Sequence, residues 1–136
     1  MRIPFTKMHG LGNDFIVVRT DGLETPEGTL IRRLANRRTG IGFDQLLWLN
    51  PPHSEDADVY YRVFNADGNE AEQCGNGARC IARLLFDSGE FRERQLVLQH
   101  ADGTLKARIQ ADGSVAVTMG IPDFRPEHVP FVTDSE

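Results

Sequence analysis

Hydrophobic and polar residues follow one another along this chain in short blocks that end at turn-forming residues. In PFTKMHGLGNDFIVV, an apolar run over residues 15–18 follows a glycine turn, which predicts two strands joined by that turn. The segments FDQLLWLNPP and DVYYRVFNADG predict one strand each. The segment QLVLQHADGTLKARIQADGSVAVTMG predicts three strands joined by two Ala-Asp-Gly turns.

Two segments follow a helical pattern instead. In TPEGTLIRRLANRRTG, Thr25 is the predicted cap, Pro26 the first helical residue and Gly40 the stop. The predicted apolar stripe of this helix consists of Leu30, Ile31, Leu34 and Ala35. Its basic residues predict a solvated face and are Arg32, Arg33, Arg37 and Arg38.

The second helix is predicted from about residue 76 to residue 87. Its apolar positions are broader than one face and comprise Ala78, Ile81, Leu84, Leu85 and Phe86. We therefore expect this helix to be buried on most sides, with Ile81, Leu84 and Leu85 in the core. Many short strands and one buried helix predict an α+β fold, a mainly antiparallel sheet wrapped round a central helix.

Composition narrows the class of protein. The chain has 136 residues, of which 40% are hydrophobic, and a net charge of −5. These values suit one globular domain and argue against a nucleic-acid partner, which needs a clustered basic face. No apolar run approaches the length of a membrane span, and the N-terminus does not resemble a signal peptide. With only two cysteines, we expect a reduced, cytoplasmic protein.

The candidate chemistry lies in FNADGNEAEQCGNGARC, where Cys74 comes directly before the second predicted helix. Unpaired N–H groups and the dipole at a helix start favour a thiolate over a thiol. Gly75 lacks a side chain, so the backbone N–H groups of Gly75 and Asn76 can approach a small anion such as a carboxylate. This arrangement suits proton exchange at a carbon beside a carboxylate. It also suits nucleophilic attack on a carbonyl.

The other candidate groups have weaker patterns. Cys80 falls inside the helix, and we expect it to pack in the core. The four histidines are scattered and the cysteine spacing is not that of a zinc site, so no metal centre is predicted. Asn13 falls in the glycine turn HGLGNDF, where Asn and Asp can supply local hydrogen bonds. Gln45 stands near a predicted strand start and Asn65 at a predicted strand end, where an amide is by itself a routine turn or edge residue.

Four motifs in this order resemble the diaminopimelate epimerase family: KMHGLGNDF, GFDQLL, FNADGNEAEQCGNGARC and MGIPDF. The resemblance covers essentially the whole chain. It implies a two-lobed fold like that of proline racemase and the PhzF-like isomerases, with a sheet round a helix in each lobe. It also implies inversion of one α-carbon of LL-diaminopimelate to the meso form, towards lysine and peptidoglycan, without pyridoxal phosphate, metal or any other cofactor.

The resemblance assigns roles by position. Cys74 matches a catalytic thiol, and Gly75 and Asn76 match the backbone cradle for the substrate carboxylate. Asn13, Gln45 and Asn65 match substrate-binding amides. The family uses a second cysteine, in a similar turn of the second lobe, and this sequence has no second such turn. Residues 1–136 are therefore expected to be the N-terminal lobe, whose partners are the C-terminal lobe, diaminopimelate and a second copy in a homodimer.

Two other interpretations stay open from the sequence. One is a related cofactor-independent isomerase that acts on another amino acid, although the three amides within the family's motifs argue against it. The other is a standalone lobe that only binds or dimerises. We expect this chain alone not to epimerise, because inversion needs acid–base groups on both faces of one carbon.

Overall fold

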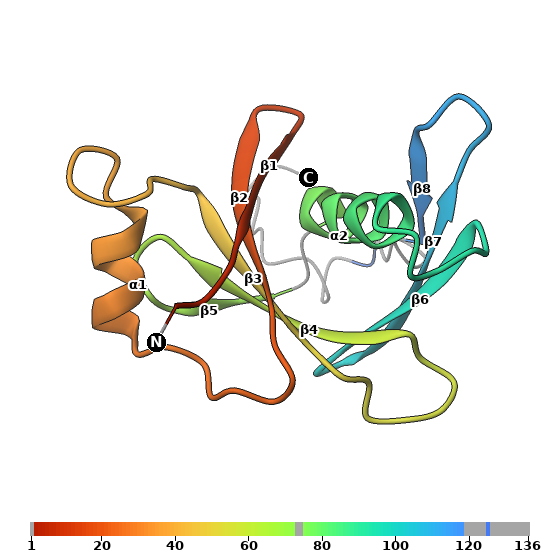
Figure 1. The fold of residues 1–136 in the computed structure, drawn as a ribbon, viewed down its shortest axis with the longest axis horizontal. Helices are drawn as coiled ribbons and strands as arrows, with labels where there is room; N and C mark the ends of the chain where they lie inside the picture. Colours follow the sequence, from red (N-terminus) through yellow and green to blue (C-terminus); the bar gives the residue numbers. More distant parts are fainter. Residues whose placement is uncertain (1, 73–74, 119–124, 126–136) are drawn as a thin grey trace.

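The computed structural model describes residues 2–72, 75–118 and 125. Figure 1 shows the arrangement of the elements. In chain order they are β1 (Thr6–Gly10), β2 (Asn13–Arg19), α1 (Gly28–Ala35), β3 (Gln45–Asn50), β4 (Val59–Asn65), β5 (Glu70–Ala71), α2 (Gly75–Asp87), β6 (Gln95–His100), β7 (Gly103–Ile109) and β8 (Val115–Val117).

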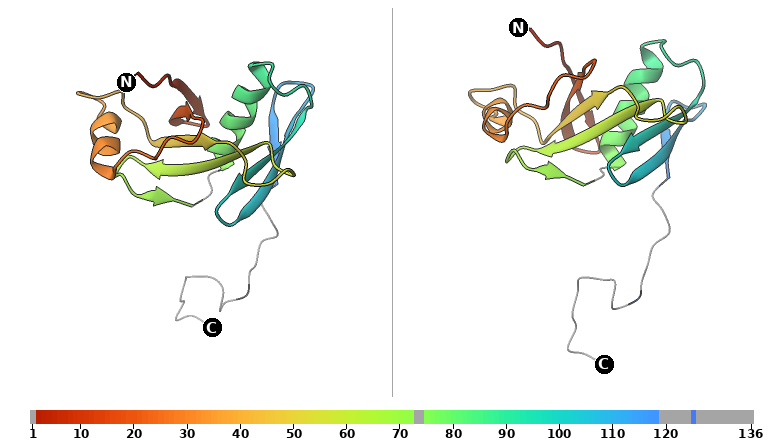
Figure 2. Two further views of the ribbon diagram at one scale, coloured as in Figure 1. Left: turned by 60° about the horizontal axis from the view of Figure 1, so that its bottom comes forward. Right: turned by 90° about the horizontal axis from the view of Figure 1, so that it is seen from below.

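The strands form a single curled sheet in the order β1-β2-β3-β4-β6-β7-β8, with β5 paired to β4. The β2–β3 and β4–β6 pairs are parallel, and the other pairs are antiparallel. The curl brings β1 and β8 to either side of α2, which packs against β1, β2, β7 and β8 (Figures 1 and 2). The predicted fold, a mainly antiparallel sheet round a central helix, is confirmed.

Strand alternation divides the core into two clusters, because successive side chains point to opposite faces of a sheet. On the concave face, Phe15, Leu47 and Tyr61 pack with the buried side of α2. On the outer face, Ile16, Leu46 and Trp48 pack with α1. The strands near the middle of the sheet are therefore apolar on both faces, as the contiguous apolar runs of the sequence required.

The helix α2 matches the predicted boundaries closely, but one of its predicted core residues is wrong. Ile81 and Leu85 are 0% and 2% exposed, whereas Leu84 is only half-buried. The buried surface of the helix is completed by small residues, Gly77, Ala78 and Ala82. Small side chains let the helix approach the sheet closely, and Leu84 packs against the margin of the same cluster while staying partly exposed.

The predicted ends of α1 are wrong. The helix begins at Gly28 after Glu27, and the Thr25 hydroxyl accepts a hydrogen bond from Arg62 at 3.4 Å instead of capping it. It ends at Ala35, because the Asn36 side chain accepts hydrogen bonds from Arg38 N (2.9 Å) and Thr39 N (3.0 Å), offering the backbone an alternative to the helix. Of the predicted stripe, Leu30 is 43% exposed.

Candidate active site

Three amide side chains, those of Asn13, Gln45 and Asn65, share one end and one face of the sheet. Gln45 pairs with Asn65 across β3–β4, and with Phe15 across β2–β3. Asn13 precedes Phe15 by two residues, so it lies on the same face as Phe15. Phe15 belongs to the concave cluster around α2. The three amides therefore face the side of the sheet on which α2 lies.

Two of these amides are hydrogen-bonded to each other. Gln45 Nε2 donates to Asn65 Oδ1 at 2.9 Å. This bond orients the two side chains, and both residues remain partly accessible. The Gln45 Oε1 atom is buried and has no hydrogen-bond partner among the described residues. A buried acceptor is costly to leave unpaired, so this oxygen is suited to a donor group on a ligand.

The start of α2 lies beside Gly10 of β1, the residue that pairs with Asn13. Asn13 pairs with Gly10 across β1–β2. A Cβ atom at Gly10 would lie 3.5 Å from Cys80 Sγ and 3.9 Å from the Asn76 carbonyl oxygen. Gly10 therefore lets β1 run directly beside the first turn of α2. Gly75 and Asn76 open that turn and are half-buried, and their backbone N–H groups have no acceptor within the helix.

The predicted catalytic thiol, Cys74, lies outside the described residues, as does the segment 119–124 that carries the MGIPDF motif. In the sequence Cys74 directly precedes Gly75, the first residue of α2. Cys80 is 6% exposed and belongs to the concave core cluster. Its predicted packing role is confirmed.

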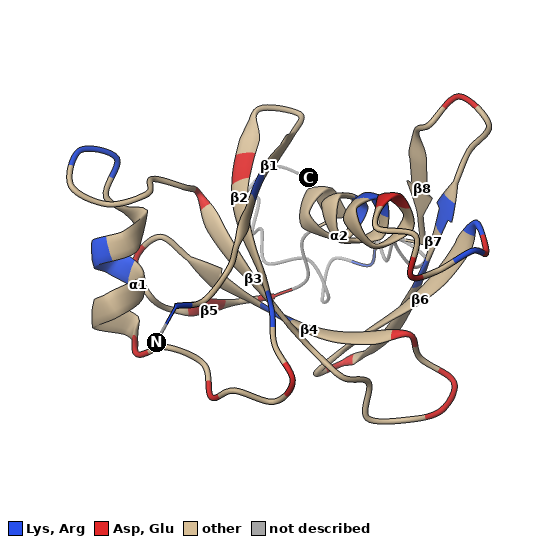
Figure 3. Cartoon of the chain, viewed as in Figure 1, with Lys and Arg blue, Asp and Glu red and all other residues tan. Residues whose placement is uncertain are grey.

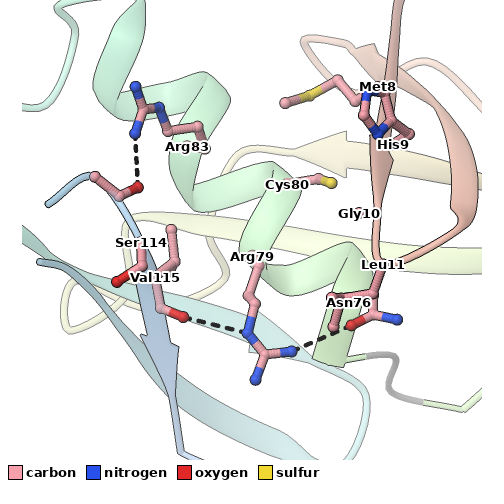
Figure 4. A pocket seen from close by; sticks show the side chains of 11 residues that line it. Met8, His9, Gly10, Leu11, Asn76, Arg79, Cys80, Arg83, Ser114 and Val115 are labelled. Carbon is pink, nitrogen blue, oxygen red and sulfur yellow. Dashed lines mark hydrogen bonds between the residues drawn. The ribbon is translucent and has the colours of Figure 1, made fainter.

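Arg79 is a neighbour of the site that sequence reasoning missed. Its NH1 group donates to Asn76 Oδ1 at 3.2 Å, and its Nε donates to the Val115 carbonyl at 3.2 Å (Figure 4). The guanidinium thus joins the first turn of α2 to β8 and brings positive charge to the helix start. The i, i+3 spacing of Asn76 and Arg79 was the signal available in the sequence.

A pocket of about 550 Å³ lies between β1, α2 and β8 (Figure 4). Its lining includes Gly10, Leu11, Asn76, Arg79 and Cys80, but none of the three amides. The pocket therefore occupies the gap between the two ends of the curled sheet, whereas the amides lie at strand ends on the face of the sheet that carries α2. Gly10 and Asn76 line the pocket, and Gly10 is also the β1 partner of Asn13.

The turn that borders this pocket has an uncommon backbone. Leu11 has φ +51° and is 86% exposed, and Gly12 has φ +88°. Two central residues with positive φ suit a two-residue hairpin between antiparallel strands. A leucine seldom adopts this conformation, and here it places an apolar side chain at the rim of the site.

A charged network lies behind the amides, on the outer face of the sheet. Arg37 donates from NH1 and NH2 to the two carboxylate oxygens of Asp14, both at 2.8 Å, and from NH2 to Asp44 Oδ1 at 3.2 Å. Figure 3 marks the basic and acidic positions along the chain, with basic residues on α1 and on the loop that follows it. Hydrogen bonding to Arg37 holds the pKa of the Asp14 carboxyl well below its usual range. Arg37 is exposed, as predicted, but it lies beyond α1 in a loop and pairs with both aspartates instead of standing free on the helix face.

Within the described part of the chain, no cluster of three or more His, Cys, Asp or Glu side chains could hold a metal ion. Over the same residues, no helix has the length and apolar character needed to cross a membrane.

Comparison with known proteins identifies the family. The family model described as diaminopimelate epimerase matches residues 5–125. The chain belongs to the diaminopimelate epimerase family. A diaminopimelate epimerase of Azoarcus sp. (strain BH72) is 46% identical over 139 residues, which cover 100% of this chain and 50% of that protein. The chain thus spans about half the length of this member of the family.

Solved structures share the fold of this diaminopimelate epimerase family chain at lower identity. A hydroxyproline epimerase from Agrobacterium vitis, with bound trans-4-hydroxy-L-proline, has a TM-score of 0.68 and 20% identity, over 86% of this chain and 41% of that one. A PhzF family protein from Enterococcus faecalis has a TM-score of 0.62 and 17% identity, over 82% of this chain and 42% of that one. These likenesses establish a common architecture.

Proposed function

We propose that residues 1–136 form the N-terminal lobe of a diaminopimelate epimerase and supply one of its two acid–base thiols. The observation that carries the proposal is the convergence of Asn13, Gln45 and Asn65 on the face of the sheet occupied by the start of α2. These residues come from three separate segments of the sequence. The resemblance gives all of them substrate-binding roles, and the fold brings them to one place.

In the proposed reaction, the Cys74 thiolate removes the proton from the substrate α-carbon. The electron pair of the C–H bond stays on that carbon and its carboxylate, and Cys74 becomes a thiol. A thiol from the second lobe then delivers a proton to the opposite face, which inverts the centre. In the reverse direction the two groups exchange roles, so both need pKa values near the working pH.

The start of α2 supports this chemistry electrostatically. The N–H groups of Gly75 and Asn76 are proposed to bind the carboxylate on the reacting carbon, where negative charge grows in the transition state. The Arg79 guanidinium, 3.2 Å from Asn76 Oδ1, adds positive charge nearby. No pyridoxal phosphate, metal or other cofactor is required in this scheme.

The amides are proposed to bind the other polar groups of diaminopimelate. The unpaired Gln45 Oε1 is a suitable acceptor for a substrate ammonium group. The Asn65 side chain is fixed by its hydrogen bond to Gln45. Amides carry both donors and acceptors, so they suit a substrate that has ammonium and carboxylate groups at each end.

The complete enzyme is proposed to need a C-terminal lobe, which supplies the second cysteine and closes the site against water. Closure would strengthen the electrostatic interactions in the site. The lobe is also proposed to belong to a homodimer, and the enzyme to work in the cytoplasm on the route to lysine and peptidoglycan.

The test follows LL-diaminopimelate in deuterated water, with this chain alone and with the complementary C-terminal half added. We expect inversion and deuterium uptake at the α-carbon only with both halves. Cys74→Ala should abolish both, while Cys80→Ala serves as the matched control. If the chain alone inverts the substrate, and Cys74→Ala abolishes that activity, the two-lobe mechanism is contradicted.

The same assay separates the alternatives. Inversion of a different amino acid, with diaminopimelate left unchanged, would favour a related isomerase. Substrate binding without exchange, even with the second half present, would favour a binding or dimerising lobe. The three amides lie within motifs that resemble the diaminopimelate epimerase family, and this favours diaminopimelate as the substrate.

A further inference from the structure

Each of the three site amides is next in sequence to a residue of one hydrogen-bonded network on the other face of the sheet. Asp14 follows Asn13, Asp44 precedes Gln45, and Ala66 follows Asn65. Because successive side chains alternate between faces, the aspartates lie on the α1 side while the amides lie on the α2 side. The network thus contacts the backbone that carries every amide without entering the site.

Asp44 is the centre of this network. Its N–H group donates to Asp14 O at 3.0 Å and to Asp14 Oδ1 at 2.9 Å, and Asp14 N donates back to Asp44 Oδ2 at 3.0 Å. The Asp44 carbonyl accepts from Ala66 N at 3.1 Å. These four bonds join the starts of β2 and β3 to the end of β4.

The regular sheet pairing stops at this point. The β2–β3 register begins at Phe15 and Gln45, and the β3–β4 register ends at Gln45 and Asn65. Beyond these pairs Asn13 and Asp14 stay paired with β1, but the spacing between the starts of β2 and β3 depends on the reciprocal aspartate bonds. Without such bonds the ends of strands are free to fray, and the side chains that they carry lose a fixed position.

Arg37 braces the two aspartates. It binds Asp14 through two parallel hydrogen bonds of 2.8 Å and Asp44 through a third of 3.2 Å. A bidentate arginine–carboxylate pair fixes geometry as well as charge. It also relieves the repulsion between two carboxylates whose oxygens bind each other's backbone. Lys7 Nζ lies 3.7 Å from Asp14 Oδ2 and adds a second cation.

We propose that Arg37, Asp14 and Asp44 form a positioning element that sets the spacing of Asn13, Gln45 and Asn65 in the substrate site. The substrate role of the amides rests on the proposed function. The claim about geometry does not rest on the proposed function, because the backbone bonds that join the network to the amides all lie within this chain. None of the three positioning residues contacts the substrate in this proposal.

The first test measures geometry in this chain by NMR, using the side-chain amide cross-peaks of Asn13, Gln45 and Asn65. Arg37→Gln removes the brace at an exposed position, so the fold should persist. The matched control is Arg19→Gln at the opposite end of β2, where Arg19 makes a bidentate pair with Glu90. We expect Arg37→Gln, but not Arg19→Gln, to move the three amide cross-peaks and to speed their hydrogen exchange.

The second test measures kinetics in the two-half enzyme. We expect Arg37→Gln to raise KM for diaminopimelate by about tenfold while kcat changes by less than about threefold, because the amides bind ground state and transition state alike. Arg37→Lys should recover part of the affinity, since it keeps one charge and loses the bidentate geometry. Arg19→Gln should leave both constants unchanged.

The outcomes are separable. Unmoved amide cross-peaks in folded Arg37→Gln would overturn the positioning element, as would a loss confined to kcat with KM unchanged. Failure of the wild-type halves to act on diaminopimelate would overturn the proposed function instead, and the NMR comparison would then decide the geometric claim by itself.

Discussion

Cys74 and Cys80 are six positions apart in the sequence and differ in their place relative to the start of α2. Cys80 is 6% exposed, packed in the cluster between α2 and the sheet. Cys74 directly precedes the first residue of α2, where the helix dipole favours a thiolate. Their different positions relative to the helix start lead to different expected reactivity.

Limited treatment of the folded chain with iodoacetamide should therefore label Cys74 before Cys80. Mass spectrometry of the digested protein locates the label, and Cys80→Ala is the control that should leave the fast phase intact. A fast phase that survives Cys74→Ser would contradict the assignment of the reactive thiol.

The carboxylate of Asp14 makes acid stability a second prediction at this scale. Its pKa in the folded chain lies below the ordinary value because Arg37 binds it. A depressed carboxyl pKa contributes stability above the unfolded pKa, near 4, and this contribution is lost as pH falls toward the folded pKa. Urea unfolding should show Asp14→Asn less stable than wild type at pH 7, with the difference shrinking below about pH 4. If the stability difference between wild type and Asp14→Asn grows as the pH falls, the stabilising role of the Asp14 carboxylate is refuted.

At the scale of elements, α2 holds the fold together and also provides the helix start of the site. Its buried side consists of small residues together with Ile81 and Leu85, and it contacts strands at both ends of the curled sheet. The same packing therefore fixes the core and the position of Gly75 and Asn76. Damage to this helix should affect stability and the site together.

Leu84 and Leu85 provide a matched pair for testing this packing. Leu85 is 2% exposed and Leu84 is half-buried. Leu85→Ala should cost about 2–5 kcal/mol of unfolding free energy, the range for a buried leucine. Leu84→Ala should cost clearly less. Equal losses in urea unfolding would mean that the two faces of α2 are packed alike.

At the scale of the whole molecule, the chain leaves apolar side chains exposed on the outer face. Ile3, Phe5 and Leu30 are 41%, 48% and 43% exposed. They border an apolar pocket of about 270 Å³ that also reaches Trp48 between β2, β3 and α1. An exposed apolar patch of this kind is typical of a surface that contacts another protein, which agrees with the proposed homodimer.

Sedimentation of the chain over a range of concentrations should accordingly show self-association. Phe5→Ser and Leu30→Ser should weaken it, because they remove apolar area at exposed positions. Leu11→Ser, at the rim of the site and 86% exposed, is the control that should leave association unchanged. A clean monomer at high concentration would contradict the homodimer.

The sequence by itself determined the local features of this protein. The alternation of apolar residues and the glycine turns located the strands and the hairpins, because these signals act between near neighbours. The apolar breadth of residues 76–87 identified the central helix. The four motifs identified the family and selected Asn13, Gln45 and Asn65. The predicted places of Gln45 and Asn65 at strand ends are confirmed, whereas Asn13, predicted in a turn, is the first residue of β2.

Tertiary structure decided what depends on contacts between distant segments. The end of α1 at Ala35 depends on Asn36 and the loop that folds back on the helix, and the half-burial of Leu84 depends on which side of α2 the sheet covers. Arg37 reads as a solvated charge in the sequence, and only the fold brings Asp14 and Asp44 beside it. Periodicity reports which face a residue occupies, whereas the partner on that face is set by chain topology.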